Sequence, residues 1–236
     1  VGSEMCIRDR YTAHRFHMGN PRKRQNISTS HGAERAEWIV AAVLTALLVA
    51  FHIARAFHAG PLWRDEAAEF NLARMPSLRQ LWDGLRLDSF GPGAPLLFRF
   101  WTATNWGASD AGVRALGCVI GISVLAALWI AGRLLRRGRP PLVSLVLLGF
   151  NGTVLVWGDS LRGYGLGMLG MLLTLALLWK VVESPKPWTV AGATLLAVLS
   201  VQCSYANALL LLGGCVGAAV VAARRGRYRL VAIILG

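Results

Sequence analysis

Three carboxylates crowd into five positions of the stretch GPLWRDEAAEFNLARM at 60–75: Asp65, Glu66 and Glu69. Asp65 and Glu69 would share one face of a helix that begins near Asp65, with Glu66 about 100° round the axis. Like charges at this spacing repel, although the positive end of a helix dipole offsets part of the cost. The cluster suits general-base chemistry or cation binding, and a solvated loop is the plain alternative. We expect Asp65 to matter most for activity and Glu69 least.

A second polar group lies in VLVWGDSLRGYGLGML at 154–169, where one apolar run ends and another begins. Asp159 and Arg162 are three residues apart there. Charge at the edge of a membrane span is costly and tends to face a cavity or a partner. A guanidinium group also matches the geometry of a phosphate. The pair is therefore a candidate phosphate site, and a neutralised turn is the structural alternative.

These groups must be positioned by membrane helices. The chain has 236 residues, of which 55% are hydrophobic and only 16% charged, which is too apolar for a soluble domain of this size. The composition predicts an all-α, polytopic transmembrane bundle. The run 95–106 has only 12 residues, about 18 Å of helix, and is too short to cross. The runs long enough to cross, or nearly so, are 38–57, 112–135, 140–157, 163–182, 188–203 and 205–223, with a seventh beginning at Tyr228.

The net charge of +13 comes from 25 basic and 12 acidic residues, and it is better explained by topology than by nucleic-acid binding. Four arginines lie in 133–139 and four in 224–229, between apolar runs. The positive-inside rule puts these loops and the basic stretch at 21–24 in the cytoplasm. We therefore expect a multi-pass protein of the cell membrane with a cytoplasmic N-terminus. The loops 58–111 and 158–162 are then extracytoplasmic.

The stretch 76–87 in the first of these loops is predicted to form an interfacial amphipathic helix. Ser77 with Gln80 makes a capping box. The apolar positions follow a helical period, and the opposite side is charged, as in a helix that lies on a bilayer. The apolar positions are Leu78, Leu81, Trp82 and Leu85.

Both ends of the chain are unusual. Residues 1–10, VGSEMCIRDR, resemble the in-frame translation of a sequencing adapter, so we exclude them and expect the true start near Met18. Residues 11–37 are then a basic cytoplasmic segment, and 38–236 form the transmembrane domain. The last apolar run stops after about nine of the ~20 residues that a span needs, so we expect this domain to be incomplete. Cys118, Cys203 and Cys215 lie in apolar runs, Cys6 lies in the excluded segment, and the four make no disulfide framework.

The order of these motifs resembles that of the GT-C superfamily of lipid-phosphosugar-dependent glycosyltransferases, especially the bacterial mannosyltransferase-like and aminoarabinose-transferase-like proteins. In that family an outer loop with an Asp-Glu pair follows the first span. A Pro-Pro-Leu-Tyr-like helix, an arginine that opens the second span and an acid-x-x-Arg-x-Tyr motif come later. The resemblance covers roughly 38–200. The family's His-Pro-Pro is GPGAP here at 91–95, and an aspartate replaces the more usual glutamate before the late arginine. The matching positions are Asp65, Glu66, Pro95, Leu96, Arg114, Asp159, Arg162 and Tyr164.

The resemblance implies an integral membrane glycosyltransferase that moves a sugar, with inversion, from a polyprenyl-phosphate carrier to an acceptor on the extracytoplasmic side. Asp65 would be the catalytic base, and Glu66 would hold the acceptor or a cation. Arg162, with Tyr164 and Asp159, would bind the lipid phosphate.

The remaining expectations concern Asp88, metal binding, partners and the alternative functions. Asp88 would contact the sugar, unless it caps a turn. The sequence has no His/Cys metal spacing, although a divalent ion near Asp65 and Glu66 would suit their carboxylates. The partners would be the lipid donor, membrane lipid and a glycan, lipid or protein acceptor, with no nucleic acid. A transporter and a non-catalytic membrane protein remain alternatives, and mid-span charges with an internal repeat would favour the transporter.

Overall fold

The computed structural model describes residues 22–235 except Leu87 and Ser89, with side chains from Gly32 onward. The expectations for residues 1–10, Cys6 and Met18 lie outside this range. Residue contacts divide the chain into two units, 1–36 and 37–236. Helix α1, Arg22–His58, begins in the first unit and ends in the second, and the candidate site lies in the second. Every regular element of the described residues is a helix, which confirms the all-α prediction.

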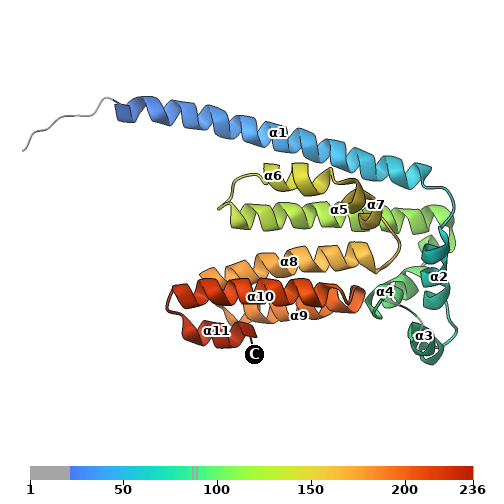
Figure 1. Cartoon of the computed structure of the whole chain (residues 1–236). Helices are drawn as coiled ribbons and strands as arrows, with labels where there is room; N and C mark the ends of the chain where they lie inside the picture. The colour runs from blue at the N-terminus through green and yellow to red at the C-terminus, as the bar shows by residue number, and fades with distance from the viewer. Residues whose placement is uncertain (1–21, 87, 89, 236) are drawn as a thin grey trace, which may run out of the picture. The chain divides into compact units, whose positions relative to one another are not determined.

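Four helices are long and apolar enough to cross a membrane, as a polytopic membrane protein requires. They are the Gly32–His58 part of α1, α5 (Asp110–Leu135), α8 (Gly163–Glu183) and α10 (Asn207–Arg224). Helix α9, Pro187–Cys203, is apolar but shorter, and α11, Tyr228–Leu235, follows α10. Figure 1 shows α5, α8, α9 and α10 running side by side.

The apolar run 140–157 does not form one continuous helix. It consists of α6 (Leu142–Ser144), a π-helical turn η2 (Leu145–Gly149) and α7 (Gly152–Gly158). Asn151 restarts the helix because its side-chain oxygen accepts hydrogen bonds from Thr153 N at 2.9 Å and Val154 N at 3.2 Å. Hydropathy alone does not predict a helix break that one polar capping residue makes inside an apolar run.

Small and polar residues hold α8, α9 and α10 together. Ser200 Oγ of α9 and Asn207 Nδ2 of α10 both donate to Gly167 O of α8, at 3.1 and 3.0 Å. Asn207 Nδ2 also lies 2.7 Å from Ser200 Oγ. Interhelical hydrogen bonds of this kind, beside glycines that allow close approach, stabilise helix pairs in membranes.

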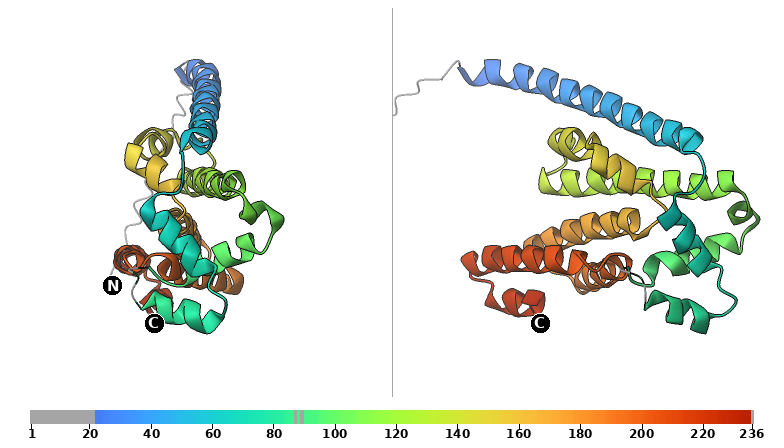
Figure 2. Two further views of the ribbon diagram at one scale, coloured as in Figure 1. Left: turned by 90° about the vertical axis from the view of Figure 1, so that its right-hand side faces the viewer. Right: turned by 45° about the vertical axis from the view of Figure 1, so that its right-hand side comes forward.

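The segment between α1 and α5 folds as α2 (Arg64–Ala73), α3 (Leu78–Leu85), α4 (Gly93–Thr102) and the 3-10 turn η1 (Asn105–Ala108). Figures 1 and 2 show these helices gathered where α1 ends and α5 begins. The α4 helix has only 10 residues, as its short apolar run predicts. Phe70 of α2 stacks on Phe98 of α4, with ring centroids 5.0 Å apart.

The predicted amphipathic helix is α3. Ser77 Oγ accepts a hydrogen bond from Gln80 N at 3.2 Å, which confirms the predicted N-cap. Its apolar side divides into two parts, because Leu81 is buried whereas Leu78 and Trp82 remain exposed. The exposed pair provides apolar area that an amphipathic helix on a bilayer would place in lipid.

Candidate active site

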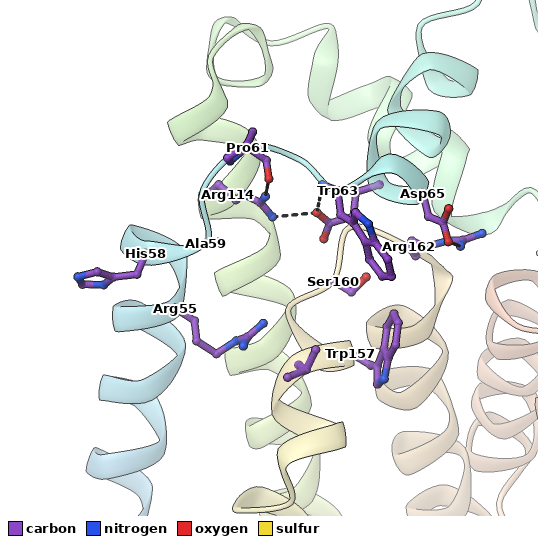
Figure 3. Close-up of a pocket in the computed structure, with 12 residues that line it drawn as sticks. Arg55, His58, Ala59, Pro61, Trp63, Asp65, Arg114, Trp157, Ser160 and Arg162 are labelled. Atoms are coloured by element: carbon purple, nitrogen blue, oxygen red, sulfur yellow. Dashed lines mark hydrogen bonds and ion pairs between the residues drawn. The ribbon is translucent and has the colours of Figure 1, made fainter.

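A cavity of about 460 Å³ lies at the end of the bundle where α1 ends and α2 and α8 begin (Figure 3). It brings together the two polar stretches of the sequence, although Asp65 and Arg162 are 97 residues apart. The lining residues come from the end of α1 and the following loop, from α2, from α5 and from the α7–α8 region. They are Arg55, His58, Ala59, Pro61, Trp63, Asp65, Glu66, Arg114, Val156, Trp157, Ser160 and Arg162.

Asp65 and Arg162 form a direct ion pair in this cavity. Asp65 Oδ2 accepts a hydrogen bond from Arg162 Nη1 at 2.8 Å, and Asp65 Oδ1 lies 3.3 Å from Arg64 Nε. On the other side of the guanidinium, Arg162 Nη2 is 3.6 Å from Asp88 Oδ1. The Arg162 guanidinium also lies over the Phe90 ring, 4.6 Å from its centroid. Two carboxylates and an aromatic ring therefore hold this arginine in one place.

Glu66 connects three segments through hydrogen bonds. Its Oε2 accepts from Arg114 Nη1 at 3.0 Å and from Trp63 N at 3.2 Å, and its Oε1 accepts from Leu161 N at 3.1 Å. These bonds link the first turn of α2 to α5 and to the segment before α8. Since both carboxylate oxygens are occupied, the geometry favours positioning of Asp65 over the predicted contact of Glu66 with an acceptor or a cation.

Asp159 does not pair with Arg162, so the alternative of a neutralised Asp159–Arg162 turn is wrong. Asp159 Oδ1 lies 2.5 Å from His52 Nδ1, and Oδ2 accepts from Arg55 Nε at 3.2 Å. A glycine in α5 makes room for this contact, because a Cβ at Gly121 would collide with Asp159 Oδ1 and the His52 ring. The partly buried Asp159 carboxylate therefore positions residues of α1 behind the cavity.

The other predicted ligands surround Arg162. Asp88 Oδ1 accepts from Phe90 N at 3.2 Å, which is the turn-capping role named as its alternative, and the same carboxylate faces Arg162. Tyr164 does not line the cavity. Its ring packs on Phe90, 4.7 Å between centroids, and on Trp157, 4.9 Å. Tyr164 therefore supports the cavity wall from behind.

The environment of Glu69 was not predicted from the sequence. Its side chain is buried, with 1% of the residue exposed, and Asp88 is the one described group with which it can share a hydrogen bond, when Glu69 is protonated. Burial, followed by the negative charge of Asp88 and a side-chain hydrogen bond with Asp88, raises the pKa of Glu69 to about 8, although Arg162 acts in the opposite direction. The i, i+4 spacing from Asp65 was visible in the sequence, but its burial under α4 and α9 was not.

His52, Arg55 and Arg114 also escaped assignment to the site. The stretch HIARAFH, residues 52–58, carried a signal for two of them. His52 and Arg55 are three apart on one helical face at the end of an apolar run, where polar groups are costly and tend to be paired. Arg114 matched a position of the resemblance, but its contact with Glu66 depends on the packing of α2 against α5.

A divalent metal fits these carboxylates poorly. Asp65 and Glu66 are each paired with an arginine, at 2.8 and 3.0 Å. Within the described part of the chain, no three His, Cys, Asp or Glu side chains gather as metal ligands would.

The arrangement is suited to proton abstraction beside an anion at a membrane surface. One carboxylate, Asp65, faces a cavity whose walls also carry three arginines and two tryptophans. Such a site could deprotonate a hydroxyl and stabilise negative charge nearby. Comparison with protein-family models, curated proteins and solved structures gives no match for this chain.

Proposed function

We propose that this protein is an integral membrane glycosyltransferase that moves a sugar from a polyprenyl-phosphate carrier to an acceptor hydroxyl, with inversion, on the extracytoplasmic side of the cell membrane. The observation that carries the proposal is the 2.8 Å contact between Asp65 and Arg162 inside the cavity. It joins a base with a phosphate-binding group in one site. The motif order that resembles the GT-C superfamily supports the same reaction.

The location of the cavity suits this class of substrate. A polyprenyl tail stays in the hydrocarbon, so its phosphate and sugar must be bound near the membrane surface. The cavity lies at the ends of α1, α5 and α8, which are long enough to span. The rings of Trp63 and Trp82 are exposed, and amphipathic side chains of this kind are enriched at membrane interfaces. Trp63 and Trp157 line the cavity and offer faces on which a sugar can pack.

In the proposed step, the acceptor oxygen attacks the anomeric carbon of the donor sugar, and its proton passes to the Asp65 carboxylate. The bond between the anomeric carbon and the phosphate oxygen breaks, and its electron pair leaves with the lipid phosphate. Attack from the face opposite the leaving group inverts the anomeric carbon. Arg162 then stabilises the charge that grows on the phosphate, which is worth about 3 kcal/mol for one preorganised donor.

The Asp65–Arg162 pair couples these two events. Before the reaction, the guanidinium is held by the Asp65 and Asp88 carboxylates. When Asp65 takes the proton, its charge disappears and its attraction for Arg162 weakens. Arg162 Nη1 is then available at the moment the phosphate becomes more negative. Glu66 contributes by fixing the first turn of α2, on which Asp65 sits.

The test is transfer of labelled sugar from a polyprenyl-phosphate donor by the full-length protein in liposomes. Asp65→Asn is nearly isosteric but cannot accept the proton, so the rate should fall by about 10²–10⁴. Asp83→Asn is a matched control, since Asp83 lies on the exposed side of α3 and does not line the cavity. Thermal unfolding checks that both variants fold. An Asp65→Asn variant with full activity would refute the assignment of the base.

A further inference from the structure

The three arginines that line the cavity differ in how many of their donors are already used. Arg114 is fully committed: Nη1 donates to Glu66, Nε to Gly60 O, and Nη2 to Gly60 O and Pro61 O. Arg162 faces two carboxylates, Asp65 and Asp88. Both guanidinium groups are therefore already paired with carboxylates, and the one donor of Arg162 that has no partner among the described residues, Nε, is buried.

Arg55 has the available donors. Its Nε donates to Asp159 at 3.2 Å, whereas its two Nη groups make no hydrogen bond with any described residue. Its side chain is 40% exposed and lines the cavity. Figure 3 shows the Arg55 side chain extending from α1 into the cavity, on the side where Ser160 lies. The Ser160 hydroxyl also makes no hydrogen bond within the described part of the chain, so it is a second free donor.

The contacts behind Arg55 fix its direction. Asp159 has only 10% of its side chain exposed and bridges Arg55 to the buried His52. Asp159 binds Nε and leaves both Nη groups of Arg55 without a partner among the described residues. Arg55 also lies in the last turn of α1, where the helix dipole favours a cation. With Nε bound by Asp159, the Nη groups of Arg55 could form charge-assisted hydrogen bonds with an anion in the cavity.

We propose that Arg55 and Ser160 form a phosphate subsite that binds the phosphate of the lipid carrier before sugar transfer. The two Nη groups of Arg55 match the two non-bridging oxygens of the donor's phosphodiester, and the Ser160 hydroxyl can donate to one of the same oxygens. The lipid identity of the ligand rests on the proposed function, whereas the phosphate chemistry does not. In this proposal Arg55 binds the phosphate of the donor before the reaction, and Arg162 stabilises the negative charge of the leaving phosphate.

Binding of polyprenyl phosphate without a sugar, to the full-length protein in nanodiscs, tests the subsite. Arg55→Gln should weaken binding roughly 10- to 100-fold and Ser160→Ala about 3- to 10-fold, since hydrogen bonds to a charged group are lost. Arg86→Gln, the same change on exposed α3 surface, should have no effect. Polyprenol should bind wild type and Arg55→Gln equally. If polyprenyl phosphate binds no more tightly than polyprenol, or if only inorganic phosphate depends on Arg55, the proposal is overturned.

Two further variants separate contact from scaffold. Asp159→Asn keeps the Arg55 charge and should retain binding within about 3-fold, because an amide oxygen still accepts from Nε. Arg55→Gln with Asp159→Asn removes one charge of each sign, so it preserves the balance behind the cavity, and it should bind as weakly as Arg55→Gln alone. If adding Arg55→Gln to Asp159→Asn costs no further affinity, Arg55 does not contact the phosphate and the subsite is refuted.

The subsite and the transferase can fail separately. Arg55-dependent binding of the lipid phosphate, without sugar transfer by the wild type, would support the subsite and refute the enzyme. Sugar transfer by Arg55→Gln with an unchanged KM for the lipid donor would refute the subsite and leave the enzyme intact.

Discussion

Replacing Glu69 with glutamine should stabilise the protein in alkaline solution and change its stability little in acid. The carboxyl group is buried, and when protonated it can share a hydrogen bond with the Asp88 carboxylate. Burial and the nearby Asp88 carboxylate raise its pKa from 4.5 to about 8, against the influence of Arg162. Cys203 is the other titratable group close by, and its ordinary form is neutral. A buried carboxylate is costly when ionised, and glutamine has nearly the same shape without the charge.

The sign and size follow from proton linkage. The folded protein holds the Glu69 proton more tightly than the unfolded chain, so the free energy of unfolding falls as pH rises. The contribution is fully present below pH 4.5 and is lost as pH rises through about 8. At about 1.4 kcal/mol per pH unit, the loss across this window approaches 5 kcal/mol. Glu69→Gln should lack this component, so its advantage over wild type grows from near zero at pH 4.5 to several kcal/mol at pH 8.5.

Denaturant unfolding of the purified protein in detergent micelles, followed by circular dichroism at pH 5, 7 and 8.5, measures this difference. Glu66→Gln is the matched control, because Glu66 is bound by Arg114 at 3.0 Å. Removing one partner of that pair should destabilise the protein by about 3–5 kcal/mol. The two variants should thus change the free energy of unfolding in opposite directions at pH 8.5. Parallel pH profiles for wild type and Glu69→Gln would refute the assignment of a buried, protonated Glu69.

Three other changes test the site and the topology. Arg162→Lys keeps the charge but loses the planar guanidinium that faces two carboxylates. Sugar transfer should therefore slow by about 10²-fold, whereas polyprenyl-phosphate binding should change little. Equal transfer rates for Arg162→Lys and wild type would show that Arg162 has only a structural role. Gly121→Ala places a Cβ against Asp159, and we expect thermal unfolding to show a loss of about 1–3 kcal/mol; unchanged stability would contradict the close packing. An impermeant thiol reagent should label Ala68→Cys but not Arg139→Cys on intact cells; both positions are exposed, and the reverse pattern would invert the predicted orientation.

Local chemistry determined much of the fold in advance. The all-α class follows from long apolar runs, the start of α3 from Ser77, and the short α4 from the length of its run. Each of these depends on neighbouring residues, whose hydropathy and capping groups act over one or two turns. The break at Asn151 was missed because one capping side chain outweighed the apolar run around it.

The meeting of Asp65 with Arg162 was expected only through sidedness and resemblance, and its geometry came from the structure. Which carboxylate pairs with which arginine depends on contacts about 100 residues apart, such as Asp159 with Arg55. The sequence presents Asp65, Glu66 and Glu69 as three similar acids. Packing makes Asp65 a half-buried partner of Arg162, Glu66 a partner of Arg114, and Glu69 a buried acid, because burial and pairing determine what a carboxylate does.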